Sequence, residues 1–335
     1  MRLSIIVPAY KVEAYIEKCI RSLEDQDIPK SDYEIIITND GSPDKSREIV
    51  EKLQAEFPNI VLINQENQGV SIARNNAINK AKGRYLMPID PDDYVLPNTF
   101  STILSTAESK DLDVLYLSFE IFSAEGKSIW HTNYNKQQHN IYDGVDAYFA
   151  ARGTNVKDPD RSWAILYRRE MIEAYQLRYP EKVPFLEDGL FISKVFSIAT
   201  KVGFDDNRFY QRTTSPGSAT VSNVFYSDRA IDGFVLSVLD VKKFRSVNQL
   251  TEKQSHLINH VVAKYTILAL SSAIGQRSIA KYLKLTKNLK EKDINTINLD
   301  GLRYDYLKLA KAYHFNALFF YGYYLLYAKL NTYKK

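Results

Sequence analysis

Two aspartates separated by one residue, Asp90 and Asp92, stand directly after a short apolar segment, in the sequence Asp-Pro-Asp-Asp. In extended chain such residues point their side chains the same way, and Pro91 restricts the backbone between them. Carboxylate oxygens grouped at the end of a strand suit Mg²⁺ or Mn²⁺, ions that usually share their shell with substrate phosphates. The spacing therefore predicts a divalent-cation site, with Asp93 as a third carboxylate. An acidic turn without a ligand is the alternative that the spacing leaves open.

The segments before these aspartates alternate between strand and helix patterns. Apolar or β-branched runs predict four strands, over residues 3–7, 33–38, 59–64 and 85–89, with helices between them. Pro43 is the expected first residue of the second helix, and the third is expected to begin at a Ser71 cap and to end at Gly83. This alternation predicts an α/β fold with a mostly parallel sheet flanked by helices.

Sheets of this kind bind ligands at the carboxyl ends of their strands, so the polar residues that follow each strand matter most. Those residues are Pro8, Ala9, Tyr10 and Glu13; Asn39, Asp40, Gly41 and Ser42; Asn67, Gln68 and Gly69; and Asp90, Asp92 and Asp93. Neither a P-loop nor a dinucleotide-binding glycine motif is among them. A cation at the aspartates, rather than a glycine loop, would then neutralise a bound diphosphate.

Four short motifs, in the same order, carry a resemblance to the family-2 glycosyltransferases, enzymes with the GT-A fold. They are Ser4-Ile5-Ile6-Val7-Pro8-Ala9-Tyr10, Asn39-Asp40-Gly41-Ser42, Asn67-Gln68-Gly69 with Ala73-Arg74-Asn75, and Ile89-Asp90-Pro91-Asp92-Asp93-Tyr94. Residues 162–169 and 185–191 resemble two later segments of the family, the second of them its Glu-Asp motif. The resemblance covers roughly residues 1–220 and implies a GT-A catalytic domain.

The resemblance implies a nucleotide-sugar site at the carboxyl edge of the sheet. Asp40 would accept a hydrogen bond from the imide N–H of a uracil-like base, which favours a UDP-sugar as donor. Asp90 would lie towards the ribose, and both Asp90 and Asp92 would belong to a site for Mn²⁺ or Mg²⁺. The other residues implied to line the nucleotide site are Pro8, Ala9, Tyr10, Glu13 and Arg74.

The later Glu-Asp motif implies the base of the reaction. Asp188 would take the proton of an acceptor hydroxyl as that oxygen attacks the anomeric carbon, and Glu187 would orient Asp188 or the acceptor. One displacement of this kind inverts the anomeric configuration and releases a nucleoside diphosphate. The acceptor implied is a glycan or a lipid-linked sugar of surface polysaccharide synthesis. Trp163 and Arg212 are further candidates for acceptor or phosphate contacts, Trp163 by stacking on a sugar. Arg212 would contact the diphosphate, since residues 210–218 lack the histidine that several relatives carry there as a metal ligand.

Each of these assignments has a structural alternative. Tyr10 and Trp163 could be packing aromatics, and Arg74 could lie on a helix surface. The two acids of the Glu-Asp motif could belong to a solvated first turn of a helix, where the helix dipole favours them. Residues 213–218 fit either a lid that orders on donor binding or a surface loop. For the chain as a whole, the alternatives are a non-catalytic nucleotide-sugar or glycan-binding protein and a nucleotidyltransferase.

Charge divides the chain in two. The protein carries a formal charge of +4, but residues 1–225 hold 26 Lys/Arg against 32 Asp/Glu, and residues 226–335 hold 18 against 8. We therefore predict a catalytic domain over 1–225 and a basic, aromatic-rich helical region over 226–335. The basic residues form no recognisable nucleic-acid-binding motif, so no nucleic acid is expected as a partner. The single cysteine, Cys19, excludes an intrachain disulfide.

The C-terminal region contains an aromatic segment bracketed by lysines. Of the 15 residues from Tyr313 to Tyr327, 8 are Phe or Tyr. Such a segment fits an interfacial helix on an anionic membrane, a helix packed on the body of the protein, or the interface of a homodimer. We expect neither a membrane span of ~20 apolar residues nor a signal peptide. The expected location is the cytoplasm, with peripheral contact at the inner face of the cell membrane.

Overall fold

The computed structural model of the protein describes residues 1–123, 125–152, 159–183, 186–213 and 223–332. The chain divides into two compact units that are interleaved along the sequence. The first contains Met1–Glu181 and Ile198–Ser218, and the second contains Lys182–Ser197 and Ala219–Lys335. The acids of the Glu-Asp motif therefore belong to the same unit as the C-terminal helices.

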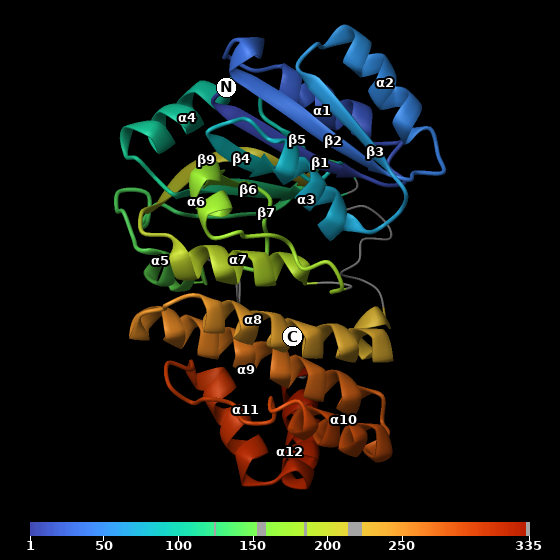
Figure 1. Ribbon diagram of the computed structural model, residues 1–335, viewed down its shortest axis with the longest axis vertical. Coiled ribbons are helices and arrows are strands. Elements are labelled where there is room, and N and C mark those ends of the chain that lie inside the picture. Colours follow the sequence, from blue (N-terminus) through green and yellow to red (C-terminus); the bar gives the residue numbers. More distant parts are fainter. Residues whose placement is uncertain (124, 153–158, 184–185, 214–222, 333–335) are drawn as a thin grey trace. The chain divides into compact units, whose positions relative to one another are not determined.

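Within the described residues, one sheet of nine strands forms the first unit's centre (Figure 1). The strands are β1 (Leu3–Ala9), β2 (Tyr33–Asp40), β3 (Ile60–Gln65), β4 (Tyr85–Pro88), β5 (Tyr94–Val95), β6 (Val114–Phe122), β7 (Ser128–His131), β8 (Ile165–Arg168) and β9 (Val202–Thr213). Their order is β3-β2-β1-β4-β8-β6-β9-β5, with β7 paired to β6. β1 to β4 run parallel, whereas β8 is antiparallel to both of its neighbours.

Helices flank the parallel part of this sheet, in which β1, β2 and β4 are buried on both faces and the edge strand β3 is partly exposed. The helices of this unit are α1 (Ile16–Glu24), α2 (Ser46–Glu56), α3 (Val70–Lys80), α4 (Phe100–Ser109), α5 (Gly144–Arg152) and α6 (Arg169–Ala174). Alternate residues of β1, from Leu3 to Ala9, belong to the core cluster that side chains of α1 and α4 complete. Ser4 and Ile6, between them, are buried too, and α3 packs against β1 and β2. The predicted α/β class is confirmed.

The start of α2 differs from the prediction. This helix begins at Ser46 rather than at Pro43. Asp44 explains the later start, because its Oδ1 accepts hydrogen bonds from the Ser46 backbone N–H (3.1 Å) and hydroxyl (2.6 Å). The residues before Ser46 therefore form an aspartate-stabilised turn instead of the first helical turn.

Both ends of α3 also differ from the prediction. The helix runs from Val70 to Lys80, so Ser71 lies inside its first turn rather than at its cap. Gly83 lies beyond the helix and packs against β1. A Cβ at Gly83 would come within 2.4 Å of the Leu3 carbonyl carbon, so this glycine permits a close approach of two backbone segments.

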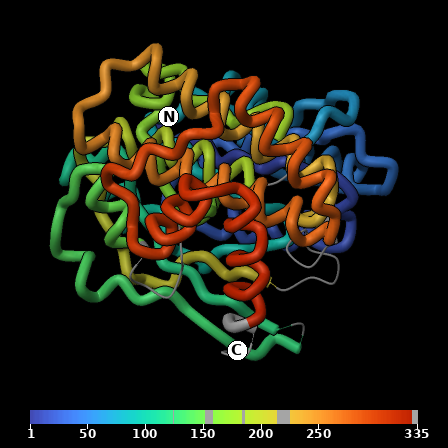
Figure 2. The backbone as a smooth tube through the Cα atoms, turned by 90° about the horizontal axis from the view of Figure 1, so that it is seen from below, coloured from blue at the N-terminus to red at the C-terminus, as the bar shows by residue number. Residues whose placement is uncertain are grey.

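The described part of the second unit is helical. Its helices are α7 (Glu187–Ile198), α8 (Asp228–Val247), α9 (Glu252–Gly275), α10 (Ile279–Glu291), α11 (Tyr304–Phe315) and α12 (Ala317–Thr332). α8 and α9 pack together, and α10, α11 and α12 each contact α9 (Figures 1 and 2). The side chains of Ser227, Thr251 and Ser278 cap the three successive helices from α8 to α10. The predicted C-terminal helical region is confirmed.

One helix in the described part of the chain, α9, is long and apolar enough to cross a membrane by length and composition. The sequence was expected to contain no such segment. Of the apolar stretch in α9, 89% is buried inside the protein, and neighbouring helices contact it along its length. A helix that is apolar all round and covered in this way is typical of the centre of a helical bundle.

Gly83→Ala should destabilise the protein, because the new Cβ would meet backbone atoms of Leu3 and Ser4 at 2.4 Å. We expect the free energy of unfolding to fall by about 1–3 kcal/mol, the usual cost of overpacking. Denaturant titration measures this difference. Gly322→Ala is the matched control, since nothing lies within 4 Å of its Cβ position and alanine favours helix. Equal stability of the two variants would contradict the close packing at Gly83.

Candidate active site

Three carboxylates lie together after β4, at the carboxyl end of the parallel strands. Asp90, Asp92 and Asp93 each offer one oxygen, and these oxygens lie within 4.8 Å of one another. The Asp93 backbone N–H donates to the Asp90 carbonyl (3.1 Å), which closes the turn, and the Cys19 thiol on α1 lies 3.8 Å from the same carbonyl. Asp90 and Asp92 are partly exposed, and Asp93 is buried. Three oxygen donors at one point fit a Mg²⁺ or Mn²⁺ site.

Two groups of β9 hold Asp93 in place. The Tyr210 hydroxyl donates a 2.6 Å hydrogen bond to Asp93 Oδ2, and the Thr213 backbone N–H donates a 2.9 Å bond to Oδ1. The Tyr210 oxygen also accepts the Asp90 backbone N–H (3.2 Å), so one hydroxyl fixes both ends of the turn. Burial, followed by repulsion from Asp90 and Asp92, raises the pKa of Asp93 to about 8. The Asp93 side chain is therefore mostly protonated at neutral pH.

Arg74 on α3 balances the negative charge of the cluster. Its Nη2 lies 2.9 Å from Asp90 Oδ1. The side chain is buried, and its guanidinium lies 5.1 Å from the centroid of the Tyr179 ring. Arg74 therefore does not lie on a helix surface, which was the alternative that the sequence left open. Its contact with a base or with phosphates stays a prediction.

Trp163 is buried and supports the cluster through Tyr210. The Trp163 ring stacks on the Tyr210 ring at 4.8 Å between centroids and 25° between planes. It meets Phe119 edge-on at 4.8 Å, and the Arg212 guanidinium lies 5.6 Å from its centroid. Trp163 is thus a packing residue in this structure. The proposed acceptor or phosphate contacts of Trp163 and Arg212 stay predictions.

Asp40 ends β2 and holds the segment that follows β3. Its Oδ1 accepts hydrogen bonds from the Gln65 side-chain amide (2.7 Å) and the Gln68 backbone N–H (2.8 Å), and its Oδ2 accepts the Gly69 backbone N–H (2.9 Å). A carboxylate has about four lone-pair sites, so these bonds leave one on Oδ2. Asp40 is therefore fixed in orientation, and its hydrogen bond to a base stays a prediction.

The residues after β1 are tied to the turn before α2. Glu13 Oε2 accepts the Lys45 backbone N–H (2.9 Å), and the Glu13 N–H donates to Asp44 Oδ2 (3.1 Å). Pro8–Ala9 are buried in β1, whereas the Tyr10 ring is exposed and so does not pack in the core. This edge of the sheet therefore presents the exposed Tyr10 ring, with the Lys11 ammonium 5.3 Å from its centroid, beside a loop held by hydrogen bonds.

Glu187 and Asp188 occupy the first turn of α7, in the second unit. Leu186, directly before them, has a φ of +60°, a left-handed conformation that leucine rarely adopts. The Tyr265 hydroxyl on α9 donates to the Leu186 carbonyl (2.9 Å), which fixes this turn. Acidic side chains are common in the first turn of a helix, where the positive end of the helix dipole lies. The roles of both acids stay predictions.

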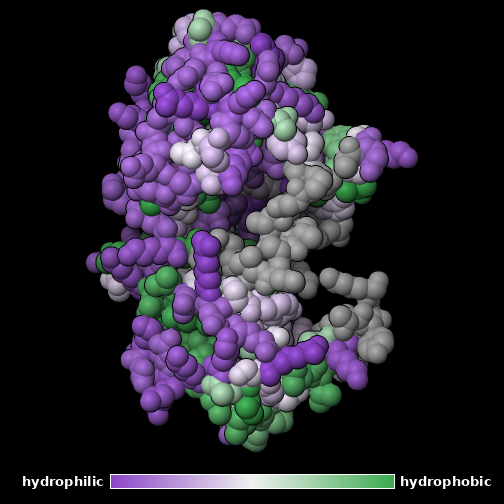
Figure 3. Space-filling model, turned by 90° about the vertical axis from the view of Figure 1, so that its right-hand side faces the viewer, coloured by the Kyte–Doolittle hydropathy of each residue, from purple (hydrophilic) through white to green (hydrophobic). Residues whose placement is uncertain are grey.

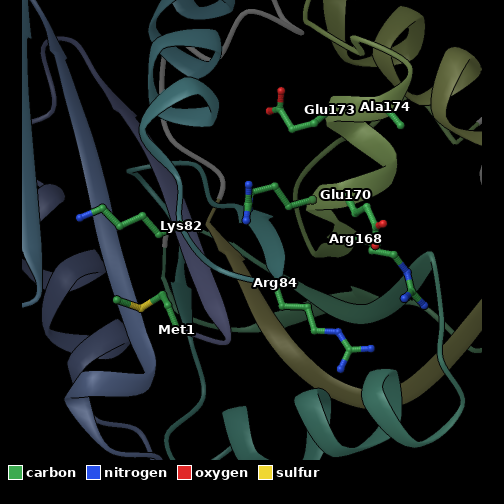
Figure 4. A pocket seen from close by; sticks show the side chains of 8 residues that line it. Met1, Lys82, Arg84, Arg168, Glu170, Glu173 and Ala174 are labelled. Carbon is green, nitrogen blue, oxygen red and sulfur yellow. The ribbon is translucent and has the colours of Figure 1, made fainter.

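A separate pocket of about 700 Å³ lies at the opposite, amino end of the strands (Figure 4). Its lining residues are Met1, Lys82, Arg84, Arg168, Arg169, Glu170, Glu173 and Ala174. Met1 precedes β1 and Arg84 precedes the parallel strand β4, so the pocket is remote from the carboxylates. Arg168 is already paired with Asp111 (2.7 Å) and Asp113 (3.2 Å). We assign this pocket no part in the site.

Sequence reasoning missed the partners of Asp93. Tyr210 and Thr213 lie 117 and 120 positions further along the chain, and no local pattern connects them to an acidic turn. The signal that the sequence does carry is the Tyr210 hydroxyl, at the start of the 210–218 segment where relatives place a metal-binding histidine. Residues 214–218 of the predicted lid lie outside the described residues.

Comparison with known proteins gives the class of the protein. The pattern of Glycosyl transferase family 2 matches residues 4–175. The chain is 33% identical to the uncharacterized glycosyltransferase EpsJ of Bacillus subtilis (strain 168) over 228 residues, which are 65% of this chain and 62% of EpsJ. It is 33% identical to EpsH of the same strain over 290 residues, 84% of this chain and 80% of EpsH. The chain belongs to glycosyl transferase family 2, and the prediction of a glycosyltransferase is confirmed at the level of this family.

Solved structures share the fold. S. aureus TarS 1-349 in complex with UDP-GlcNAc matches with a TM-score of 0.62 and 19% identity, over 91% of this chain and 93% of that chain. The mannosyltransferase PcManGT from Pyrobaculum calidifontis, in complex with GDP-Man and Mn²⁺, matches with a TM-score of 0.52 and 13% identity, over 98% and 88%. At these identities the likeness concerns the fold alone, and it confirms the GT-A prediction.

Asp93→Asn should change how stability depends on pH. The folded pKa of about 8 lies above the ordinary 3.8, so the proton on Asp93 stabilises the folded state at low pH, and this contribution is lost as pH rises towards 8. The loss reaches at most about 1.4 kcal/mol per pH unit. Free energies of unfolding from about pH 5 to about pH 9 should therefore shift in favour of the variant as pH rises. The exposed Asp25→Asn is the control, and a pH-independent difference would contradict the raised pKa.

Proposed function

We propose that the chain transfers a sugar from a nucleoside-diphosphate sugar, with a UDP-sugar as the favoured donor, to a hydroxyl of a glycan or lipid-linked acceptor in surface polysaccharide synthesis. The observation that carries this proposal is the cluster of Asp90, Asp92 and Asp93, with Arg74 2.9 Å from Asp90. Carboxylates and a buried guanidinium cation together at the carboxyl edge of a parallel sheet suit a diphosphate and its metal ion.

The donor set of the cluster fits a divalent cation. Its ligands are carboxylate oxygens, which Mg²⁺ and Mn²⁺ prefer over softer metals. Asp90 and Asp92, the more exposed pair, would hold the ion, and Asp93 supports them from the buried side. When bound, such a cation supplies charge stabilisation for a departing diphosphate. Arg74 would orient Asp90 through the ion pair that it already makes.

The ligands named for the structural neighbours support the class of donor. TarS 1-349 is described in complex with UDP and with UDP-GlcNAc, and PcManGT with GDP-Man and Mn²⁺. A third sequence relative, 24% identical over 228 residues, is named poly(ribitol-phosphate) beta-N-acetylglucosaminyltransferase TarS, from Staphylococcus aureus (strain Mu50 / ATCC 700699). These names support a nucleotide-sugar donor and a cell-surface polymer as acceptor.

Asp188 would act as the general base. The proton of the acceptor O–H passes to the Asp188 carboxylate while the acceptor oxygen bonds to the anomeric carbon and the bond to the diphosphate oxygen breaks. Attack from the face opposite the leaving group inverts the anomeric configuration. Asp188 lies in the first turn of α7, and Glu187, beside it in the same turn, would orient it.

A panel of nucleotide sugars with Mn²⁺ and a glycan acceptor tests the proposal. Release of nucleoside diphosphate together with a lengthened glycan would support it. Release of sugar 1-phosphate, with the nucleoside monophosphate transferred to the acceptor, would instead identify a nucleotidyltransferase. Donor binding without any release would identify a non-catalytic nucleotide-sugar-binding protein.

Asp188→Asn should abolish transfer and leave donor binding intact, because it removes the proton acceptor and keeps the side-chain shape. We expect the transfer rate to fall by about 100-fold or more, and the donor Kd, measured by calorimetry, to stay within about twofold of the parent value. Asp146→Asn, at an exposed acid in the first turn of α5, is the matched control. Transfer at the parent rate by Asp188→Asn would show that another group is the base.

Asp92→Ala should weaken the part of donor binding that depends on Mn²⁺. Loss of one carboxylate ligand removes both a charge and a bond to the cation, and we expect the donor Kd in Mn²⁺ to rise by about tenfold or more. Binding in the presence of a chelator should change little. Asp25→Ala, at an exposed aspartate, is the control. If Mn²⁺ strengthened donor binding equally in parent and variant, Asp92 would not be a ligand.

A further inference from the structure

The last described helix, α12, is apolar along its exposed side. Its exposed residues recur at helical spacing and continue from the end of α11. They are Phe315 (77% exposed), Leu318 (54%), Phe319 (50%), Leu325 (45%) and Leu326 (65%), and we call them the α12 stripe. A surface helix normally places charged side chains there, but Lys329 is the one charged residue of α12. Figure 3 shows apolar side chains gathered at this end of the molecule.

The opposite side of α12 is fixed to neighbouring helices. Phe320 is fully buried, and its ring meets the Tyr313 ring edge-on at 5.7 Å. The Tyr282 hydroxyl on α10 donates to the Ala317 carbonyl at the start of α12 (2.7 Å). Asn316 caps the helix, because its Oδ1 accepts the backbone N–H of Leu318 (2.8 Å). The stripe is therefore presented by a packed helix, and packing on the protein leaves it uncovered within the described residues.

Basic groups lie beside the stripe. Residues 279–332 hold nine Lys or Arg against four Asp or Glu. A pocket of about 570 Å³ adjoins the stripe, and its lining residues are Thr286, Lys287, Lys290, Asn295, Thr296, Tyr313, His314 and Ala317. His314 and Ala317 are the sequence neighbours of Phe315 and Leu318, so the pocket opens where the stripe begins. Lys287 also faces Glu291 (3.8 Å), but both side chains are exposed, and such a surface pair is weak. The two ammonium groups beside this hollow therefore suit a phosphate group.

We propose that the α12 stripe and this pocket form a docking surface for an anionic bilayer. The apolar side chains would enter the boundary between headgroups and acyl chains, and Lys287 and Lys290 would bind the phosphate of a lipid headgroup. Charge complementarity supports this occupant, because the lysines attract an anionic surface that the stripe alone would not select. In this proposal α12 lies in the headgroup region and does not cross the bilayer, since its 16 residues are fewer than the ~20 that a membrane span needs.

A second copy of the chain is the rival occupant of this surface. In a two-fold dimer the same patch meets itself. Each copy would then bring the same basic patch into the interface, and neither patch would supply the opposite charge that the other lacks. An anionic bilayer neutralises these lysines and buries the stripe at the same time, so the charge pattern favours the membrane.

Sedimentation of the full chain with vesicles tests the proposal. The protein should bind vesicles that contain phosphatidylglycerol, bind phosphatidylcholine vesicles far less, and lose affinity as salt rises. Phe319→Ser with Leu326→Ser should weaken binding by about tenfold or more. Ile129→Ser with Ile141→Ser, at two similarly exposed residues of the first unit, is the matched control and should bind like the parent.

The charged part of the surface has its own variant pair. Lys287→Gln with Lys290→Gln should weaken binding to phosphatidylglycerol vesicles by about fivefold for each lysine removed. Lys52→Gln with Lys80→Gln, at two exposed lysines of the first unit, should have little effect. The variant Phe319→Trp adds a third tryptophan to Trp130 and Trp163. Vesicles with brominated acyl chains should quench the tryptophan fluorescence of this variant more than that of the parent.

Vesicle binding that the serine pair leaves unchanged would overturn the proposal. A parent dimer in light scattering that the serine pair converts to a monomer, without vesicle binding, would assign the stripe to a second copy. Nucleoside diphosphate release, measured without vesicles, should be the same in all of these variants. Failure of the membrane proposal therefore remains distinct from failure of the proposed transfer.

Discussion

Three carboxylates share the end of β4, and their mutual repulsion constrains the first unit. Two full charges about 5 Å apart, at an effective dielectric constant of about 20, repel by about 3 kcal/mol. The protein meets this repulsion in three ways. Arg74 pairs with Asp90, Asp93 holds a proton, and the Tyr210 hydroxyl and Thr213 N–H donate into the turn. Arg74, Tyr210 and Thr213 come from outside the acidic turn, so the order of the strands matters to the cluster as well as to the apolar core.

The support of Asp93 extends through several layers of side chains. Tyr210, which contacts Asp93, rests on Trp163, and the buried guanidinium of Arg161 fixes the backbone of Trp163 through its carbonyl (2.6 Å). The same guanidinium donates to the Leu117 carbonyl on β6 (3.1 Å). A column of side chains therefore connects β6 to the acidic turn. This explains why residues far apart in the sequence combine to orient the turn.

The sequence predicted those features that depend on local pattern. Strands such as Tyr33–Asp40 were predictable because apolar runs between polar turns define parallel strands, and the ordered motifs placed Asp40 and Asp90 at one edge. Long-range pairing was not predictable in the same way, since nothing near Asp93 in the sequence specifies Tyr210. Gly83 was wrongly predicted to end α3. In the sequence, a glycine that caps a helix cannot be told from one that lets a neighbouring strand pack closely against it. The side of α12 that packs on its neighbours could not be predicted from the sequence, because apolar residues occur all around that helix.

The burial of Cys19 beside the carboxylate cluster determines how the protein reacts with thiol reagents. The single thiol is fully buried against the Asp90 carbonyl, and burial, with the nearby aspartates, raises its pKa well above the ordinary range. Reagents that attack thiolates therefore meet no reactive native target. A cysteine introduced at an exposed position would be labelled alone. The natural sequence thus serves directly as a background for attaching one dye or spin label to each compact unit and following the distance between them while a donor binds.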